Sequence, residues 1–158
     1  LENQQIVTDQ TEYRLDEQLR SCVLLLEKQW SAKNIELALE LEPACFYGNE
    51  EMCSHIWLNL LGNAVKFSPE GGLMEIRLTV QDDRVTVTIR DQGPGMDEAT
   101  RKRIFEKFYQ GDSAHATEGN GLGLSLVKRI VDLCNGTVCV DSRPGEGAAF
   151  TVTLPRST

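Results

Sequence analysis

The sequence lacks an apolar run near the ~20 residues that a bilayer-spanning helix needs, and it carries no signal peptide. It also lacks an excess of positive charge, since 24 acidic residues outweigh 16 basic ones and leave a formal net charge of -8. This balance argues against binding to nucleic acid and against direct contact with an anionic membrane. An anionic ligand would need a locally positive site, built from a helix N-terminus and a few lysines.

The five cysteines contain no CxxC pair and no zinc-ligand spacing. Most of them lie in apolar runs, so we expect buried, reduced thiols of a cytosolic protein. The five are Cys22, Cys45, Cys53, Cys134 and Cys139.

A chain of 158 residues with 41% hydrophobic and 25% charged residues suits one globular domain with a real core. Residues 1–12 are polar and without periodicity, so we expect a linker there and one domain over residues 13–158. Because the first residue is Leu1 rather than Met, we expect a piece of a longer protein, with the linker leading from an N-terminal domain.

Hydrophobic periodicity predicts an order of elements unlike that of an alternating βαβ chain. The predicted helices cover residues 15–30, 49–67, 97–103 and 124–134. The predicted strands cover residues 35–41, 74–80, 85–89, 138–140 and 150–154. Neighbouring strands joined by short turns favour antiparallel pairs, and hence an α+β layered fold with helices on one face of a sheet.

The helix expected at 49–67 is mostly apolar but carries a polar stripe. His55, Asn59, Asn63 and Lys66 recur at intervals of four, four and three residues, which places them on one face. Asn is a mediocre helix former, because its amide competes for the backbone. Two asparagines one turn apart indicate amide oxygens directed at a ligand, with a solvated face as the alternative.

The motif Asp91-x-Gly93-x-Gly95 follows directly on the strand expected at 85–89. A carboxylate there would lie at the floor of a cleft, and the glycines let backbone approach a flat ligand. An ionised carboxylate only accepts hydrogen bonds, so it suits the amino group of adenine and would oppose the carbonyl of guanine. The alternative is a turn aspartate that caps the helix beginning at Asp97.

Gly119, Gly121 and Gly123 precede the last predicted helix and could offer backbone amides to phosphate. Alone they are weak evidence, since a loop with a helix cap explains them equally. They do not follow a strand, as a dinucleotide-binding fingerprint requires. The sequence also contains neither a P-loop nor the HRD and DFG motifs of eukaryotic protein kinases.

Taken together and in this order, the motifs resemble those of the catalytic, ATP-binding domain of a bacterial sensor histidine kinase, in the GHKL ATPase superfamily. The similar stretches are residues 59–67 (N box), 91–95 (G1 box), 104–109 (F box) and 119–124 (G2 box). The resemblance extends over residues 15–155. It implies the Bergerat fold, a two-layer α/β sandwich whose mixed, mainly antiparallel sheet of about five strands has helices on one face.

The resemblance implies that the chain binds ATP and Mg²⁺. Asp91 would hold the adenine amino group, Asn63 would offer its side-chain oxygen to Mg²⁺, and Lys66 would neutralise phosphate charge. The G2 glycines would cradle phosphates with their backbone amides. The nucleotide-binding residues that the motifs imply are Asn59, Asn63, Lys66, Asp91, Gly93, Gly95, Gly119, Gly121, Leu122, Gly123 and Leu124.

Asn59 carries the most informative difference within the superfamily. The resemblance implies that it contacts the phosphate–magnesium cluster, whereas ATP-hydrolysing relatives place a Glu there to activate water. An Asn amide is no general base at neutral pH, so little hydrolysis is expected. Lys107 is the second catalytic candidate, as a cation for the γ-phosphate, with a solvated residue as the alternative. Residues 110–118 would form an ATP lid, and Phe105 and Phe108 would serve in packing.

Neither histidine has the context of a phosphoacceptor, because His55 lies in the N-box helix and His115 in the expected lid. In the family, the acceptor histidine lies in a separate dimerising helical domain. The resemblance therefore implies a protein-histidine kinase of a two-component system, with that dimerisation domain and a downstream response regulator as partners. The isolated domain is expected to be monomeric, and to form a cytoplasmic part of a homodimeric, membrane-anchored receptor.

Two other functions stay open at this point. One is another GHKL enzyme, either an anti-sigma-factor-like serine kinase or an ATPase, which acid-stable phosphoserine or steady phosphate release would identify. The other is a binding module that has lost catalysis, which a titration without ATP binding would favour.

Overall fold

The computed structural model describes residues 9–106 and 123–156, and its main feature is a five-stranded sheet. The strand order is β2 (Glu36–Leu41), β4 (Leu73–Val80), β5 (Arg84–Asp91), β7 (Ala148–Pro155) and β6 (Thr137–Ser142). β2 pairs with β4 in parallel, and the other three pairs are antiparallel. The predicted mixed, mainly antiparallel sheet is therefore confirmed.

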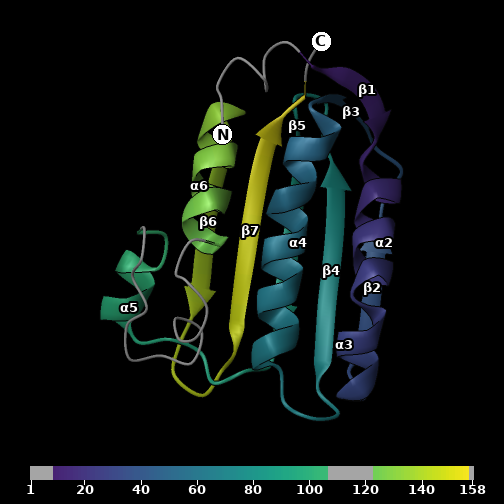
Figure 1. The fold of residues 1–158 in the computed structure, drawn as a ribbon. Helices are drawn as coiled ribbons and strands as arrows, with labels where there is room; N and C mark the ends of the chain where they lie inside the picture. Colours follow the sequence, from purple (N-terminus) through teal and green to yellow (C-terminus); the bar gives the residue numbers. More distant parts are fainter. Residues whose placement is uncertain (1–8, 107–122, 157–158) are drawn as a thin grey trace.

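The longer helices cover one face of this sheet, as expected, and a short helix lies at its side (Figure 1). The helices are α2 (Leu15–Leu25), α3 (Glu27–Ala32), α4 (Glu50–Phe67), α5 (Glu98–Arg103) and α6 (Gly123–Leu133). The single helix predicted for residues 15–30 is wrong, because Leu26 leaves the helical conformation at φ -101° and ψ 14°. The indole nitrogen of Trp30 then donates to the carbonyl of Val23 across this break, at 2.9 Å.

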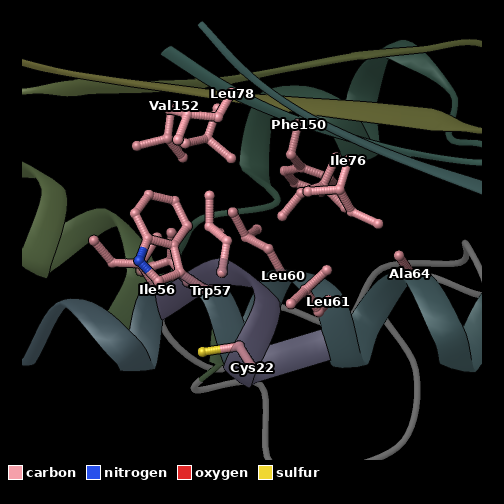
Figure 2. Packing of buried hydrophobic residues seen from close by; sticks show 14 of the residues in the cluster. Cys22, Ile56, Trp57, Leu60, Leu61, Ala64, Ile76, Leu78, Phe150 and Val152 are labelled. Atoms are coloured by element: carbon pink, nitrogen blue, oxygen red, sulfur yellow. The ribbon is translucent and has the colours of Figure 1, made fainter. Parts of the chain in front are cut away.

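The core lies between α4 and the sheet. Figure 2 shows Trp57 and Leu60 of α4 directed at sheet residues such as Leu78 and Val152. Trp57 is fully buried, and its indole N–H donates to Oε1 of Gln18 at 2.8 Å, so its polar atom is satisfied. Burial of each such apolar side chain contributes about 1.5–3 kcal/mol, which fixes α4 rigidly on the sheet.

Both ends of α4 are capped. At the start, Oδ1 of Asn49 accepts from the backbone N–H of Met52 at 2.9 Å, as a cap residue should. At the end, the ammonium of Lys33 donates to the carbonyls of Val65 and Lys66, each at 2.9 Å. The polar side chains near the end of α4 are therefore carried by a helix whose two ends are both capped.

A second, two-stranded sheet pairs β1 (Thr11–Arg14) with β3 (Cys45–Gly48) and was not predicted. Strands of four residues give too short an alternation to recognise. β1 begins at Thr11, so the last two residues of the expected linker belong to the folded part, and the rest of the domain division stays a prediction.

The expectation of buried thiols holds only in part. Cys22 and Cys53 are buried and Cys134 is half-buried, but Cys45 and Cys139 are exposed, and all five are free. The expectation is wrong for those two because they alternate outward on β3 and β6. Within residues 9–106 and 123–156, we find no helix long and apolar enough to cross a membrane.

Candidate functional site

Most of the described candidate residues gather at one end of the sandwich. The C-terminal half of α4, the end of β5, and the starts of β7 and α6 meet there, at the lower end of the view in Figure 1. Asp91 is the last residue of β5 and pairs with Ala148, the first of β7. Antiparallel pairing therefore brings the G1 box against the closing hairpin.

Asn59 connects α4 with the start of α6. Its Nδ2 donates to the carbonyl of His55 at 2.7 Å, which fixes the amide and turns Oδ1 outward. A Cβ placed on Gly123 would lie 2.9 Å from that Oδ1, closer than real Cβ contacts come. The N box and the G2 box therefore meet at these two residues, and a side chain at position 123 would have to displace the Asn59 amide.

Asn63 lies one turn further along α4 and is half-buried. Its Nδ2 is buried and has no hydrogen-bond partner within the part of the chain that the structure describes. A buried donor without a partner costs about 1–3 kcal/mol, so this nitrogen is suited to an acceptor from outside the described chain. The amide oxygen is of the kind that Mg²⁺ takes as a ligand.

The remaining two stripe residues, His55 and Lys66, are exposed. The ammonium of Lys66 lies 5.4 Å from the ring centroid of Phe67, an arrangement that holds the cation near the end of α4. The stripe is thus divided between two half-buried amides and two exposed residues.

Asp91 is only 2% exposed, a rare position for a carboxylate. Its Oδ1 accepts from the backbone N–H of Gly93 at 2.7 Å. The alternative role as the cap of the next helix is wrong, because Oδ1 of Asp97 takes it by accepting from Thr100 at 2.8 Å. That backbone N–H lowers the pKa of Asp97.

Two glycines allow the backbone around Asp91 to pack. Gly95 and Gly147 have φ values of +74° and +72°, which side-chain-bearing residues rarely adopt. A Cβ on Gly147 would overlap the carbonyl oxygen of Asp91, and one on Gly95 would overlap that of Arg143. The G1 box therefore fits its surroundings only with glycine at both positions.

Ser142 at the end of β6 is a positioning residue that the sequence did not reveal. The backbone N–H of Met96 donates to its buried Oγ at 2.9 Å, and the hydroxyl donates to the carbonyl of Gly147 at 2.6 Å. Ser142 thus joins the G1 box to the closing hairpin. No sequence signal marks it, since its partner Met96 lies 46 residues away.

The structure places Gly123 and Leu124 at the start of α6, with Leu124 against the core. Phe105 packs edge-on against Phe150 at 6.1 Å between ring centroids, so its predicted packing role is confirmed. The other candidates lie outside the described residues: Lys107, Phe108, the lid at 110–118 with His115, Gly119, Gly121 and Leu122.

A buried carboxylate at a strand end and a helix-borne amide facing a glycine agree with the arrangement expected for the GHKL class. A family model described as histidine kinase-, DNA gyrase B- and HSP90-like ATPase matches residues 48–158, and the chain belongs to this family. The resemblance inferred from the motifs is thereby confirmed.

Individual relatives agree with this family assignment. The chain is 37% identical over 135 residues to the heme sensor protein HssS of Staphylococcus saprophyticus, covering 84% of this chain and 29% of HssS. The structure resembles a mycobacterial sensor histidine kinase MprB with a TM-score of 0.85 and 30% identity, covering 92% and 98% of the two chains. Full-length ShkA in complex with AMPPNP gives a TM-score of 0.83 and 33% identity, covering 94% of this chain and 31% of ShkA.

Proposed function

We propose that this domain binds Mg²⁺-ATP and transfers the γ-phosphoryl group to a histidine on a separate dimerisation domain, as the catalytic part of a sensor histidine kinase. The chain spans less than a third of HssS, so the acceptor and the sensor would lie elsewhere in a longer protein. The observation that carries the proposal is the buried Asp91 carboxylate at the end of β5. The C-terminal half of α4 lies at the same end of the sandwich (Figure 1).

Asp91 is assigned to the adenine base. Its Oδ1 already accepts from Gly93, and a carboxylate has further lone pairs for the exocyclic amine of adenine. Guanine would present a carbonyl to this buried acceptor, and two facing acceptors repel. The domain should therefore prefer ATP over GTP.

Asn63 is assigned to the metal. Its side-chain oxygen would coordinate Mg²⁺, and its buried, unpartnered Nδ2 would donate to a phosphate oxygen. This pairing satisfies both ends of the amide, so the residue fits the ion that the family implies. When bound, Mg²⁺ offsets the charge of the phosphates; Lys66 and the α6 N-terminus at Gly123 would add positive potential.

Asn59 is assigned to holding phosphate and metal without activating water. Its amide has no basic group, and its Nδ2 is already committed to the carbonyl of His55. Phosphoryl transfer depends on positioning and charge stabilisation, with Lys107 as the candidate cation for the γ-phosphate. ATP should therefore persist until a histidine nucleophile arrives.

The partners follow from this role. A dimerisation domain carrying the acceptor histidine would present it to the γ-phosphate, and a response regulator would take the phosphoryl group afterwards. We place the domain on the cytoplasmic side of a homodimeric, membrane-anchored receptor, since that is where ATP is available, and expect the domain alone to be monomeric.

The test is calorimetric titration of the isolated chain with ATP, with and without Mg²⁺, together with a phosphate-release assay. We expect Mg²⁺-dependent binding with negligible release. Asn63→Ala should weaken Mg²⁺-ATP binding by about tenfold or more, because a charge-assisted contact is lost. The matched control is His55→Ala, an exposed residue on the same helix, which should bind normally. Normal binding by Asn63→Ala would refute the metal assignment.

The same assays separate the alternatives. Steady phosphate release would identify an ATPase, and acid-stable phosphoserine on an added protein would identify a serine kinase. A flat titration in the presence of Mg²⁺ would identify a module without nucleotide binding.

A further inference from the structure

Gln92 lies inside the G1 box, between buried Asp91 and buried Gly93, and is itself exposed. Its Oε1 accepts from the backbone N–H of Leu73, the first residue of β4, at 2.9 Å. The two residues are 19 positions apart. This hydrogen bond therefore connects the segment proposed to bind adenine with the strand beside it.

The register of the sheet explains why a side chain makes this contact. The antiparallel ladder between β4 and β5 ends at Arg90, whose partner lies two residues after the start of β4. Continued by two residues, the same register would place Leu73 opposite Gln92. At the other end of the ladder it reaches Gln81, whose N–H donates to the carbonyl of Arg84 at 2.8 Å, so pairs of this parity are the hydrogen-bonded ones. In a continued ladder the N–H of Leu73 would donate to the backbone carbonyl of Gln92, and it donates to the side-chain oxygen of that residue instead.

The chain thus leaves β4 after Arg90, and the glutamine side chain spans the gap. The departure lets the segment turn, so that the N–H of Gly93 donates back to Oδ1 of Asp91 at 2.7 Å. On the other side, Asp91 stays paired with Ala148 of β7. Asp91 is therefore fixed by a strand on one side, and on the other by a side chain whose length sets the distance to β4.

The anchor of this hydrogen bond is itself fixed. Leu73 follows the turn after α4, where the N–H of Gly71 donates to the carbonyl of Lys33 at 2.8 Å. The N–H of Glu36 donates to the carbonyl of Gly72, also at 2.8 Å, at the start of the parallel pairing of β2 with β4. The G1 segment is therefore attached to a turn that another segment of the chain already holds in place.

We propose that Gln92 is a positioning residue for base selection: its side-chain oxygen sets where the Asp91 carboxylate lies, and thereby how strongly the site prefers adenine to guanine nucleotides. The inference rests on the proposed function, because it takes Asp91 as the partner of the exocyclic amine. Gln92 acts through Asp91 and does not touch the base. A displaced carboxylate would weaken both the contact with the amine and the repulsion of the guanine carbonyl, because hydrogen bonds weaken steeply with poor geometry.

The test compares two substitutions of Gln92 with a matched control. Gln92→Met keeps the length of the side chain and removes the amide oxygen, whereas Gln92→Glu keeps an oxygen acceptor at the same length. The control is Gln81→Met. Gln81 is an exposed glutamine at the other end of the same pair of strands, and its Oε1 also accepts a hydrogen bond, from Arg84.

Calorimetric titration with Mg²⁺-ATP, and displacement of the bound ATP by GTP, give both affinities for each variant. We expect Gln92→Met to reduce the preference for ATP at least about tenfold, and Gln92→Glu to keep it within about threefold of the wild type. Gln81→Met should leave the preference unchanged. A residue that only stabilised the fold would not change this ratio, because both nucleotides would lose affinity alike.

Amide hydrogen exchange measured by NMR tests the positioning without any nucleotide. The N–H groups of Leu73 and Gly93 should exchange at least about tenfold faster in Gln92→Met than in the wild type, and at the wild-type rate in Gln92→Glu. Gly93 reports on the carboxylate because its N–H donates to Oδ1 of Asp91. Protected amides elsewhere in β5 show that the variant is folded.

Unchanged exchange at Gly93 in Gln92→Met would overturn the proposal. So would an unchanged ATP-to-GTP ratio in a Gln92→Met chain that binds ATP. A wild-type chain that binds neither nucleotide would refute the proposed function, and the exchange of Gly93 would still decide whether Gln92 holds Asp91 in place.

Discussion

Gly147→Ala should perturb the part of the site around Asp91, the residue proposed to bind adenine. Gly147 has a φ of +72°, and a Cβ there would overlap the carbonyl oxygen of Asp91. Gly145 on the same turn has a φ of +80° but open space around the added atom. The two glycines thus share the backbone strain and differ only in the collision.

The expected magnitudes follow from that difference. A left-handed alanine costs about 1–2 kcal/mol, which is the whole effect expected for Gly145→Ala. Gly147→Ala adds the cost of displacing β5 from β7, about 1–3 kcal/mol on the scale of overpacked cores. The hydroxyl of Ser142 donates to the Gly147 carbonyl at 2.6 Å, so a displaced turn also disturbs this hydrogen bond. We therefore expect a total of about 2–5 kcal/mol.

Urea unfolding followed by tryptophan fluorescence measures these free energies, and calorimetric titration with Mg²⁺-ATP measures the site. Gly147→Ala should weaken ATP binding at least about tenfold by moving Asp91, whereas Gly145→Ala should bind as the wild type does. Equal loss of stability in the two variants would refute the overlap. Unchanged ATP affinity in a folded Gly147→Ala chain would refute the proposed dependence of adenine binding on this turn.

Three further predictions concern other parts of the molecule. Gly123→Ala should weaken ATP binding about tenfold while changing the unfolding free energy by less than about 1 kcal/mol, because its Cβ would displace the Asn59 amide and not the core; unchanged affinity would contradict this. Asp16→Asn should cost about 2–3 kcal/mol near neutral pH in urea unfolding, because buried Asp16 accepts from Arg14 at 2.6 and 2.8 Å. These bonds hold the pKa of Asp16 well below its usual range. The contribution of Asp16 to the free energy of unfolding is therefore complete above about pH 4, and it falls with decreasing pH by up to about 1.4 kcal/mol per pH unit. A stability difference between Asp16→Asn and the wild type that does not shrink at pH 3 would contradict this prediction. Trp57→Phe should cost about 2–3 kcal/mol by thermal unfolding, because the buried Oε1 of Gln18 loses the indole N–H that donates to it. A variant as stable as the wild type would contradict this prediction.

The sequence was sufficient to predict the long helices and strands. The helix α4 and the pair β4 and β5 carry eight or more residues of clear periodicity, and their burial pattern follows it. The four-residue strands β1 and β3 were missed because their pairing joins residues 31 to 37 positions apart, from Arg14↔Cys45 to Thr11↔Gly48, which no local pattern reports. The break at Leu26 was missed because helical periodicity continues on both sides of it.

Candidate site residues could be recognised in the sequence where a residue would act through its own chemistry. Asp91 and the amides of α4 stood out because a strand-end carboxylate and helical asparagines are unusual choices. Ser142 and the collision at Gly147 could not be found, because both depend on strands brought together by the fold. Motifs locate the groups proposed to touch a ligand, and the structure is needed to find the groups that hold those residues in place.

The central claim is that this site delivers phosphate to a histidine. The direct measurement is incubation of the chain with ATP labelled at the γ-phosphate and a dimerisation domain from its own longer protein, followed by acid and alkali treatment. The account predicts label on the histidine of that domain, stable to alkali and labile to acid, and its loss with Asp91→Asn at limiting ATP. Bound ATP without label on the histidine would contradict the account.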